Sequence, residues 1–201
     1  MMAVQSSLRN MLLVLVAVCL VASAALGSIY TLTKKPIEAA QAAKTNAAIA
    51  AVIPQFDNNP SDPANVIEVE SNGTISRVYT GKKGDEVVGY AIEASTSKGF
   101  GGNITIMVGF TPDGTIVNTS VISHSETPGL GAKIADPKEP FIVQFQGVNP
   151  SDPDFKLAVK KDGGSVDAIT ASTITSRAFC DAIANACSVF FKLNKSGEAQ
   201  E

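Results

Sequence analysis

The chain contains few histidine and cysteine residues. Its 201 residues include one histidine, three cysteines and no tryptophan. It has no C-x-x-C pair, which argues against an iron–sulfur centre, and no C-x-x-C-H motif, which argues against a c-type haem. The stretch SHSE around His124 offers too few ligands at a metal-binding spacing, so we expect no metal and at most an accessory role for His124. If this chain carries electrons, the sequence predicts an organic carrier.

Other absences remove further classes of function. The formal net charge of −3 provides no basic face for nucleic acid. The stretches GFGGNI and GLGAKI begin G-x-G but lack the third glycine of a dinucleotide-binding loop, and no G-x-S-x-G hydrolase motif is present. Cys180 and Cys187 are seven residues apart in a helical pattern, a rise of roughly 10 Å, so we predict two small core residues and no disulfide.

The N-terminal region contains a long apolar run. Residues 10–33 hold no Asp, Glu, Lys, Arg or His, and they are numerous enough to cross a bilayer as a helix. A cleaved signal peptide is the alternative, but the apolar core is longer than a typical signal sequence has. A lipoprotein reading of Cys19 is disfavoured because Val18 precedes it where a small residue is expected. We therefore predict a short segment at 1–9 and a transmembrane anchor at 10–33.

The rest of the chain predicts an α+β domain. Residues 34–65 form a connector, an Ala-rich helix with Pro36 in its first turn that ends before Pro54, followed by a polar loop. From residue 66 the sequence alternates apolar and polar residues with many β-branched side chains, which predicts a largely antiparallel sheet with flanking helices. The expected strands are 66–70, 75–81, 86–95, 103–110 and 115–124, with a hairpin turn at Asp113-Gly114.

An amphipathic helix is expected near the C-terminus, over about 173–193, with 196–201 as a frayed tail. Its apolar side is predicted to begin at Ile174. The other members of this side are Ala178, Ala182, Ile183, Ala186, Val189 and Phe190.

Two stretches concentrate unusual residues. In SHSETPGLGAKI, residues 123–134, the glycines Gly129 and Gly131 would let the backbone approach a flat ligand, with Leu130 as an apolar face and Glu126 as an acceptor. An ordinary turn that ends a strand explains the same composition. From this stretch alone, both alternatives remain open.

The second stretch, DAITASTITSRAF at residues 167–179, places many hydroxyl groups where the last helix begins. Unpaired N–H groups and the helix dipole make a helix N-terminus a natural phosphate site. The simpler alternative is that Ser172 or Thr173 caps the helix and that Thr170, Thr175 and Ser176 are incidental. The residues alone do not decide between these alternatives.

These stretches resemble two motifs of the covalent FMN-binding domains. Asp167, Thr170 and Thr173 fall on the fixed positions of the flavinylation motif, and HSETPGLGAKI is similar to the second motif of the family. GFGGNITIMVGFTPDGTIV resembles the segment before it. Two departures are Ala171 and Ser172, where the family usually has Gly-Ala. A methyl group at the first position would disfavour a positive φ, and the added hydroxyl would be able to bond the phosphate.

The resemblance implies a set of cofactor-binding residues. They are Glu126, Thr127, Gly129, Leu130, Gly131, Asp167, Thr170, Ser172, Thr173, Thr175 and Ser176. FMN would be esterified through its phosphate to Thr173, by a magnesium-dependent flavin transferase that uses FAD. Thr127, Leu130 and Glu126 would border the flavin ring within a domain covering 66–195. Thr175 and Ser176 are expected to point outward from the first helical turn, and Thr170 lies too early to share the phosphate environment.

By chain length, the resemblance is to the G-subunit family of the Rnf complexes, membrane-bound ferredoxin:NAD oxidoreductases that couple electron flow to ion pumping. It implies an electron-relay subunit of the inner membrane, with its domain on the periplasmic side and membrane, iron–sulfur or flavin subunits as partners. The C-subunit family of the sodium-pumping NADH:quinone reductases is the related alternative. A cofactor-free, membrane-anchored binding module is a rival of another class. The sequons at Asn72, Asn103 and Asn118 would suit such a module if it were glycosylated.

Overall fold

The computed structural model describes residues 7–53, 55–62, 65–71 and 74–198. Pro54, the sequon at Asn72 and the outermost residues of both predicted end segments lie outside this range. The chain divides into two compact units, Met1–Ala43 and Lys44–Glu201.

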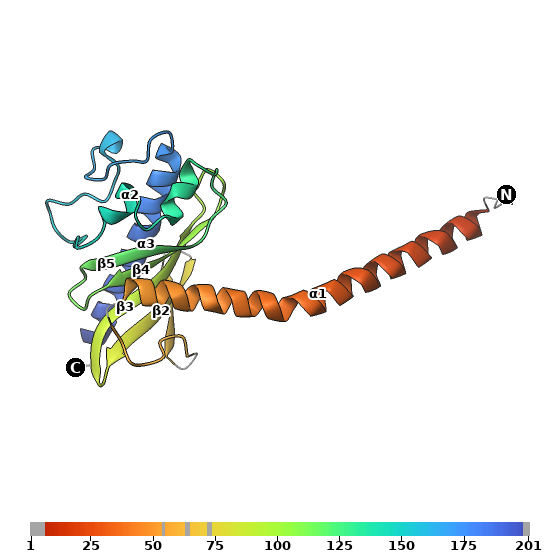
Figure 1. Cartoon of the computed structure of the whole chain (residues 1–201), viewed down its shortest axis with the longest axis horizontal. Coiled ribbons are helices and arrows are strands. Elements are labelled where there is room, and N and C mark those ends of the chain that lie inside the picture. The colour runs from red at the N-terminus through yellow and green to blue at the C-terminus, as the bar shows by residue number, and fades with distance from the viewer. Residues whose placement is uncertain (1–6, 54, 63–64, 72–73, 199–201) are drawn as a thin grey trace. The chain divides into compact units, whose positions relative to one another are not determined.

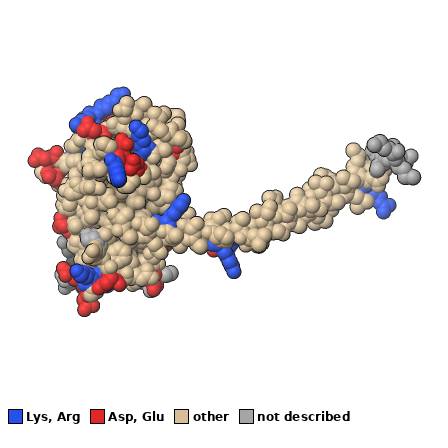
Figure 2. Space-filling view, viewed as in Figure 1, with Lys and Arg blue, Asp and Glu red and all other residues tan. Residues whose placement is uncertain are grey.

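The first unit is the greater part of helix α1, which covers Leu8–Val52. α1 continues through Pro36, so the prediction of a second helix starting near Pro36 is wrong. A proline inside a helix removes one backbone hydrogen bond, and the many bonds on either side allow a long helix to tolerate that loss. In the described parts of the chain, α1 alone is long and apolar enough to cross a bilayer. Figure 2 shows a surface almost without charge along its apolar part.

The second unit is built on a five-stranded sheet (Figure 1). Its strands are β1 Val66–Ser71, β2 Thr74–Lys83, β3 Glu86–Thr96, β4 Ile104–Phe110 and β5 Ile116–Ser123. Each strand pairs antiparallel with the next, in the order β1-β2-β3-β4-β5. The predicted α+β class, the antiparallel sheet and the β4–β5 hairpin are confirmed.

One face of the sheet packs against helix α3, Thr173–Glu198. The two sheet faces take alternate residues of the strands, as the pleat requires, so Ile106 and Val108 of β4 turn toward α3. Near the far end of the helix, Phe190 stacks on Phe110 with 5.0 Å between ring centroids. This face carries the larger hydrophobic core of the domain, and it holds α3 in place over the sheet.

The opposite face of the sheet carries a smaller core. The last turns of α1 contribute Ala48, Ile49 and Val52, which pack with side chains from the strands such as Tyr79 and Met107. The end of α1 therefore belongs to the folded domain by its packing, although its beginning is apolar and exposed.

Three short helical segments connect β5 to α3. These are η1 Gly131–Ala135, α2 Pro140–Val143 and η2 Lys160–Asp162. Apolar side chains from this stretch, including Ile134, Phe145 and Ile169, extend the core on the α3 side. The packing anchors both ends of the connection against α3, so the loop after β5 lies beside the first turn of the helix.

Cys180 and Cys187 are free and buried on α3. Burial in apolar surroundings raises the pKa of each thiol to about 12, because the thiolate would lose its solvation. Neither thiol is therefore a nucleophile at neutral pH. The prediction of two small core residues without a disulfide is confirmed.

Candidate functional site

The chain turns sharply before α3 begins. The Ser172 N–H donates to the Ile169 carbonyl over 3.0 Å, and Ala171 between them has φ of 61°. The first bond onto the helix runs from the Ser176 N–H to the Ser172 carbonyl, also over 3.0 Å. The N–H groups of residues 173–175 have no acceptor among the described residues, as expected for a first helical turn.

Two hydroxyl groups of this turn point into the protein. Thr175 donates to Glu126 Oε2 over 2.6 Å. Ser176 donates to the Ser172 carbonyl and accepts from the Ile169 N–H, both over 3.0 Å. The prediction that these two side chains point outward is wrong. They lie on the same stripe as the buried Ala178, Phe179 and Ala182, two to seven residues later, so they face the core.

The buried stripe begins one residue later than the sequence suggested. Ile174 was expected on the apolar side of the helix, but 49% of its surface is exposed. Thr173 before it is half-buried, and no described residue hydrogen-bonds its hydroxyl group. Thr170 is exposed and likewise without such a bond in the described chain, whereas Ser172 is buried. The hydroxyl groups thus divide into an inward set and an outward set.

A cavity of about 330 Å³ opens beside this turn. Three segments line it: the loop before β4, the loop after β5 and the start of α3. The lining residues are Phe100, Glu126, Thr127, Leu130, Gly131, Ala171, Ser172, Thr173, Ile174 and Thr175. Phe100, Leu130 and Ile174 contribute large apolar side chains that are well exposed. A cavity that joins apolar side chains to unpaired N–H groups suits a flat ring that carries a phosphate.

Glu126 connects the three segments. Its side chain is buried, and besides Thr175 it accepts a bond from the Gly101 N–H over 3.0 Å. The Glu126 N–H itself donates to His124 Nδ1 over 3.1 Å. The His124 ring therefore supports the loop by accepting a hydrogen bond from its backbone.

The structure brings together most of the predicted site residues, with four exceptions. Asp167 is exposed and pairs with Lys160, with 2.7 Å between Oδ2 and Nζ. Gly129 has φ of 76° and forms the turn of its loop without lining the cavity. Thr170 and Ser176 also lie outside the cavity lining.

Sequence reasoning missed Phe100, Ala171 and Ile174 as lining residues. Phe100 had a usable signal, since an aromatic residue among the glycines of GFGGN has no strand to pack on. Ile174 had none, because the helical period alone does not fix which residue first reaches the core.

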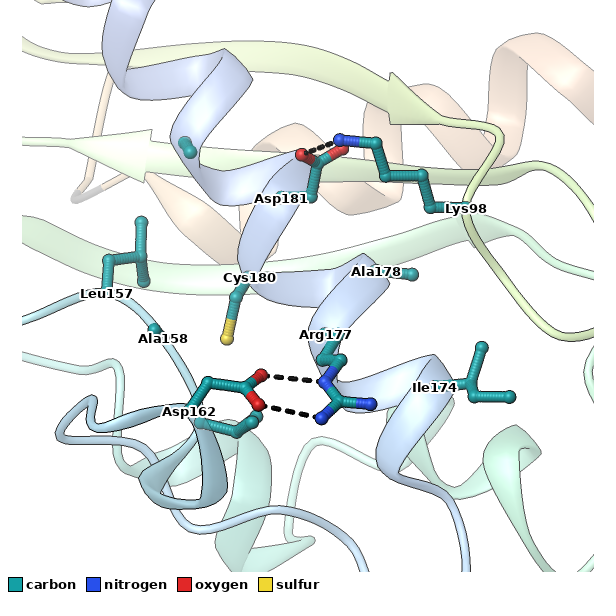
Figure 3. A pocket seen from close by; sticks show the side chains of 11 residues that line it. Lys98, Leu157, Ala158, Asp162, Ile174, Arg177, Ala178, Cys180 and Asp181 are labelled. Carbon is teal, nitrogen blue, oxygen red and sulfur yellow. Dashed lines mark hydrogen bonds and ion pairs between the residues drawn. The ribbon is translucent and has the colours of Figure 1, made fainter.

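A second cavity, of about 440 Å³, also has Ile174 in its lining (Figure 3). Two ion pairs border it: Lys98 Nζ to Asp181 at 2.6 Å, and Arg177 to Asp162 through two bonds of 2.7 Å. The Arg177 hydrogen bonds lower the pKa of Asp162, which stays ionised at neutral pH. Although this cavity is larger, none of the hydroxyl groups at the start of α3 lines it. The smaller cavity is therefore the candidate site.

Comparison with known proteins agrees with this geometry. The FMN-binding domain family matches residues 99–188, a range that begins at the loop of Phe100 and ends within α3. The fold and the cavity thus belong to an FMN-binding domain.

The similar proteins carry a common name. The G subunit of the ion-translocating oxidoreductase complex of Haemophilus influenzae (strain PittEE) is 37% identical over 153 residues, covering 75% of this chain and 74% of the relative. Its counterpart in Pasteurella multocida (strain Pm70) is 35% identical over 189 residues, 91% of this chain and 94% of the relative. That of Cereibacter sphaeroides is 35% identical over 161 residues, 79% and 73% of the two chains. The chain belongs to this G-subunit family of the ion-translocating oxidoreductase complexes.

Proposed function

We propose that this chain relays electrons through an FMN group that is esterified to Thr173. The observation that carries the proposal is the division of hydroxyl groups at the start of α3. Within the flavinylation motif, Thr173 is half-buried and lines the cavity. No described residue forms a hydrogen bond with its hydroxyl group. Thr175 lines the same cavity, but its hydroxyl group is bound to Glu126.

Attachment would use FAD as the donor and a flavin transferase with magnesium as the catalyst. Oxygen Oγ1 of Thr173 would form a bond to the phosphorus next to the ribityl chain, while the pyrophosphate bond breaks and AMP leaves with the hydroxyl proton taken up by solvent. The reaction changes no oxidation state. The product is a phosphoester that keeps one negative charge at the start of α3.

The surroundings of Thr173 suit that charge. The unpaired N–H groups of residues 173–175 lie at the positive end of the helix dipole, which stabilises an anion by roughly 0.3 to 1 kcal/mol at an exposed site. Ser172, the departure from the family pattern, adds a hydroxyl group to the cavity lining. The apolar side chains of Leu130, Phe100 and Ile174 would border the ring, with Thr127 at its edge.

FMN would supply one- and two-electron transfer, and this chain would hold and orient it. A relay has no substrate of its own, so a covalent bond is useful because it keeps the cofactor on an exposed domain that exchanges electrons with partners. We accordingly assign no catalytic residue to the chain.

Membership of the G-subunit family supports the proposal that the relay works within a membrane complex. The apolar part of α1 would anchor the chain in the inner membrane, with the domain on the periplasmic side and other membrane, iron–sulfur or flavin subunits as partners. Solubilisation of the complex in mild detergent, followed by identification of the subunits that co-purify, tests this assignment. Recovery of the quinone reductase subunits instead would place the chain in the alternative complex.

The cofactor is tested on the purified full chain after co-expression with a flavin transferase. We expect a yellow protein whose flavin survives denaturation, with the added mass on the tryptic peptide that contains Thr173. A colourless protein from cells with a competent transferase would favour the cofactor-free binding module.

A further inference from the structure

We infer that Glu126 is a positioning residue that assembles the flavin cavity and fixes the acceptor turn. The inference rests on the proposed attachment at Thr173. It assigns to Glu126 a role through other residues of the chain, distinct from direct contact with a cofactor.

The carboxylate of Glu126 joins the three segments that line the cavity. Oε1 accepts from the Gly101 N–H at 3.0 Å, next to Phe100 in the loop before β4. Oε2 accepts from Thr175 at 2.6 Å, in the first turn of α3. Glu126 itself belongs to the loop after β5, which carries Leu130.

Two glycines leave the space that the Glu126 carboxylate fills. A Cβ atom on Gly99 would lie 2.7 Å from Oε1, and one on Gly131 would lie 2.6 Å from both Oε2 and the Thr175 hydroxyl group. Such distances are too short for non-bonded atoms. These two glycines therefore admit the buried side chain of Glu126, and Gly131 serves internal packing in addition to lining the cavity.

Both partners of the hydrogen bond between Thr175 and Glu126 are buried. Glu126 is only 5% exposed and Thr175 only 2% exposed, so Oε2 of Glu126 and the hydroxyl group of Thr175 depend on each other for a hydrogen bond. An unpaired buried acceptor is costly, which disfavours any shift of the turn away from Glu126. Thr175 lies two residues after Thr173 in the same helical turn, so its bond to Glu126 restrains the backbone that presents the acceptor hydroxyl group.

The consequence is a rate effect on attachment. A reacting group that moves by about an ångström can lose roughly a hundredfold in rate, because the attack requires a narrow range of distance and direction. Loss of the bond between Glu126 and Thr175 would release the first turn of α3 and the Leu130 loop together. Thr173 would remain present and chemically intact, but it would be presented less often in the reactive geometry.

The test measures the initial rate at which protein-bound flavin fluorescence appears when the purified full chain is incubated with FAD, magnesium and a flavin transferase. Thr175→Val removes the hydroxyl group at constant shape, and Thr175→Ser restores it. Glu126→Leu removes both acceptors. Glu126→Gln keeps the shape of the side chain. It also keeps both hydrogen bonds, because the amide can accept from the Gly101 N–H and donate to the Thr175 hydroxyl group.

A matched control separates positioning from stability. Phe110→Leu weakens the core where Phe110 meets Phe190, away from the first turn of α3, and its melting temperature is measured beside those of the other variants. We expect Thr175→Val and Glu126→Leu to slow attachment roughly 10- to 100-fold. Thr175→Ser, Glu126→Gln and Phe110→Leu should stay within a few-fold of the unchanged chain.

Two results would overturn the inference. One is attachment at the unchanged rate in folded Thr175→Val and Glu126→Leu. The other is a rate that follows melting temperature across all variants, with Phe110→Leu as slow as the rest. If the unchanged chain itself takes up no flavin, the proposed function fails, and this inference fails with it.

Discussion

The hydroxyl groups on the two sides of the first turn of α3 differ in what they contact. On the inner side, Thr175 and Ser176 are buried, and each holds a hydrogen-bond partner in another segment or turn. On the outer side, Thr170 and Thr173 have hydroxyl groups without a partner among the described residues. The motif thus combines hydroxyl groups that are held by hydrogen bonds, at Thr175 and Ser176, with a hydroxyl group at Thr173 that is free to react.

The largest expected effect concerns the outer side. Thr173→Val keeps the shape of the side chain and removes its oxygen, so we expect complete loss of flavin that survives denaturation. The domain should still fold, because the Thr173 hydroxyl group makes no bond to a described residue. Ultraviolet fluorescence of the band in a denaturing gel measures the result.

Thr170→Val is the matched control for that experiment, since Thr170 also has a hydroxyl group without a described partner but does not line the cavity. Its band should fluoresce like that of the unchanged chain. A dark Thr170→Val band beside a fluorescent Thr173→Val band would show that the attachment point and the alignment of the motif are wrong.

On the inner side, Ser176 is expected to affect stability and not attachment, unlike Thr175, whose bond to Glu126 restrains the acceptor turn. Ser176→Ala leaves the buried Ile169 N–H without its acceptor, and such an unsatisfied group costs about 1 to 3 kcal/mol. Urea unfolding of the flavin-loaded chain should show this loss in the free energy of unfolding. The flavin should remain attached, and its loss in a folded Ser176→Ala protein would remove the distinction between the two sides.

A smaller effect is expected at the rim of the cavity. Leu130→Asp replaces an exposed apolar side chain beside the proposed ring position with a charge, so the absorption bands of the flavin should shift. The phosphoester at Thr173 should persist, because Leu130 lies on a different loop. Visible absorption before denaturation and gel fluorescence after it separate the two outcomes, and an unchanged spectrum would move the ring away from Leu130.

Much of the fold could be predicted from the sequence because local patterns decide it. Alternation of apolar and polar residues located all five strands to within a few residues, and the Asp113-Gly114 turn located one hairpin. The course of α1 was harder to predict, since Pro36 is a usual sign of a helix start and nothing local shows that the helix continues through it.

Most residues that line the cavity could be predicted from the sequence, but the directions of their side chains could not. The resemblance brought Glu126, Leu130 and Thr173 to one place, and the structure joins them in one cavity. The inward direction of Thr175 depends on Glu126, 49 residues earlier in the chain, and on a core that only the folded domain provides. Contacts between distant segments leave no periodic pattern in the sequence.

The smallest expected effect lies at Ala171, which separates the two outer hydroxyl residues from each other. Among the described residues other than glycine, it alone has a positive φ, 61°, and the family usually has glycine there. The left-handed conformation costs an alanine about 1 to 2 kcal/mol. Replacement by glycine removes that strain but adds about 0.4 to 1 kcal/mol of conformational entropy to the unfolded chain. Ala171→Gly should therefore stabilise the domain by about 0 to 1.6 kcal/mol. Urea unfolding measures this gain, and a loss of stability would mean that the turn before α3 differs from the one described.

Attachment at Thr173 should stay the same or become faster in Ala171→Gly, because the turn keeps its conformation at lower cost.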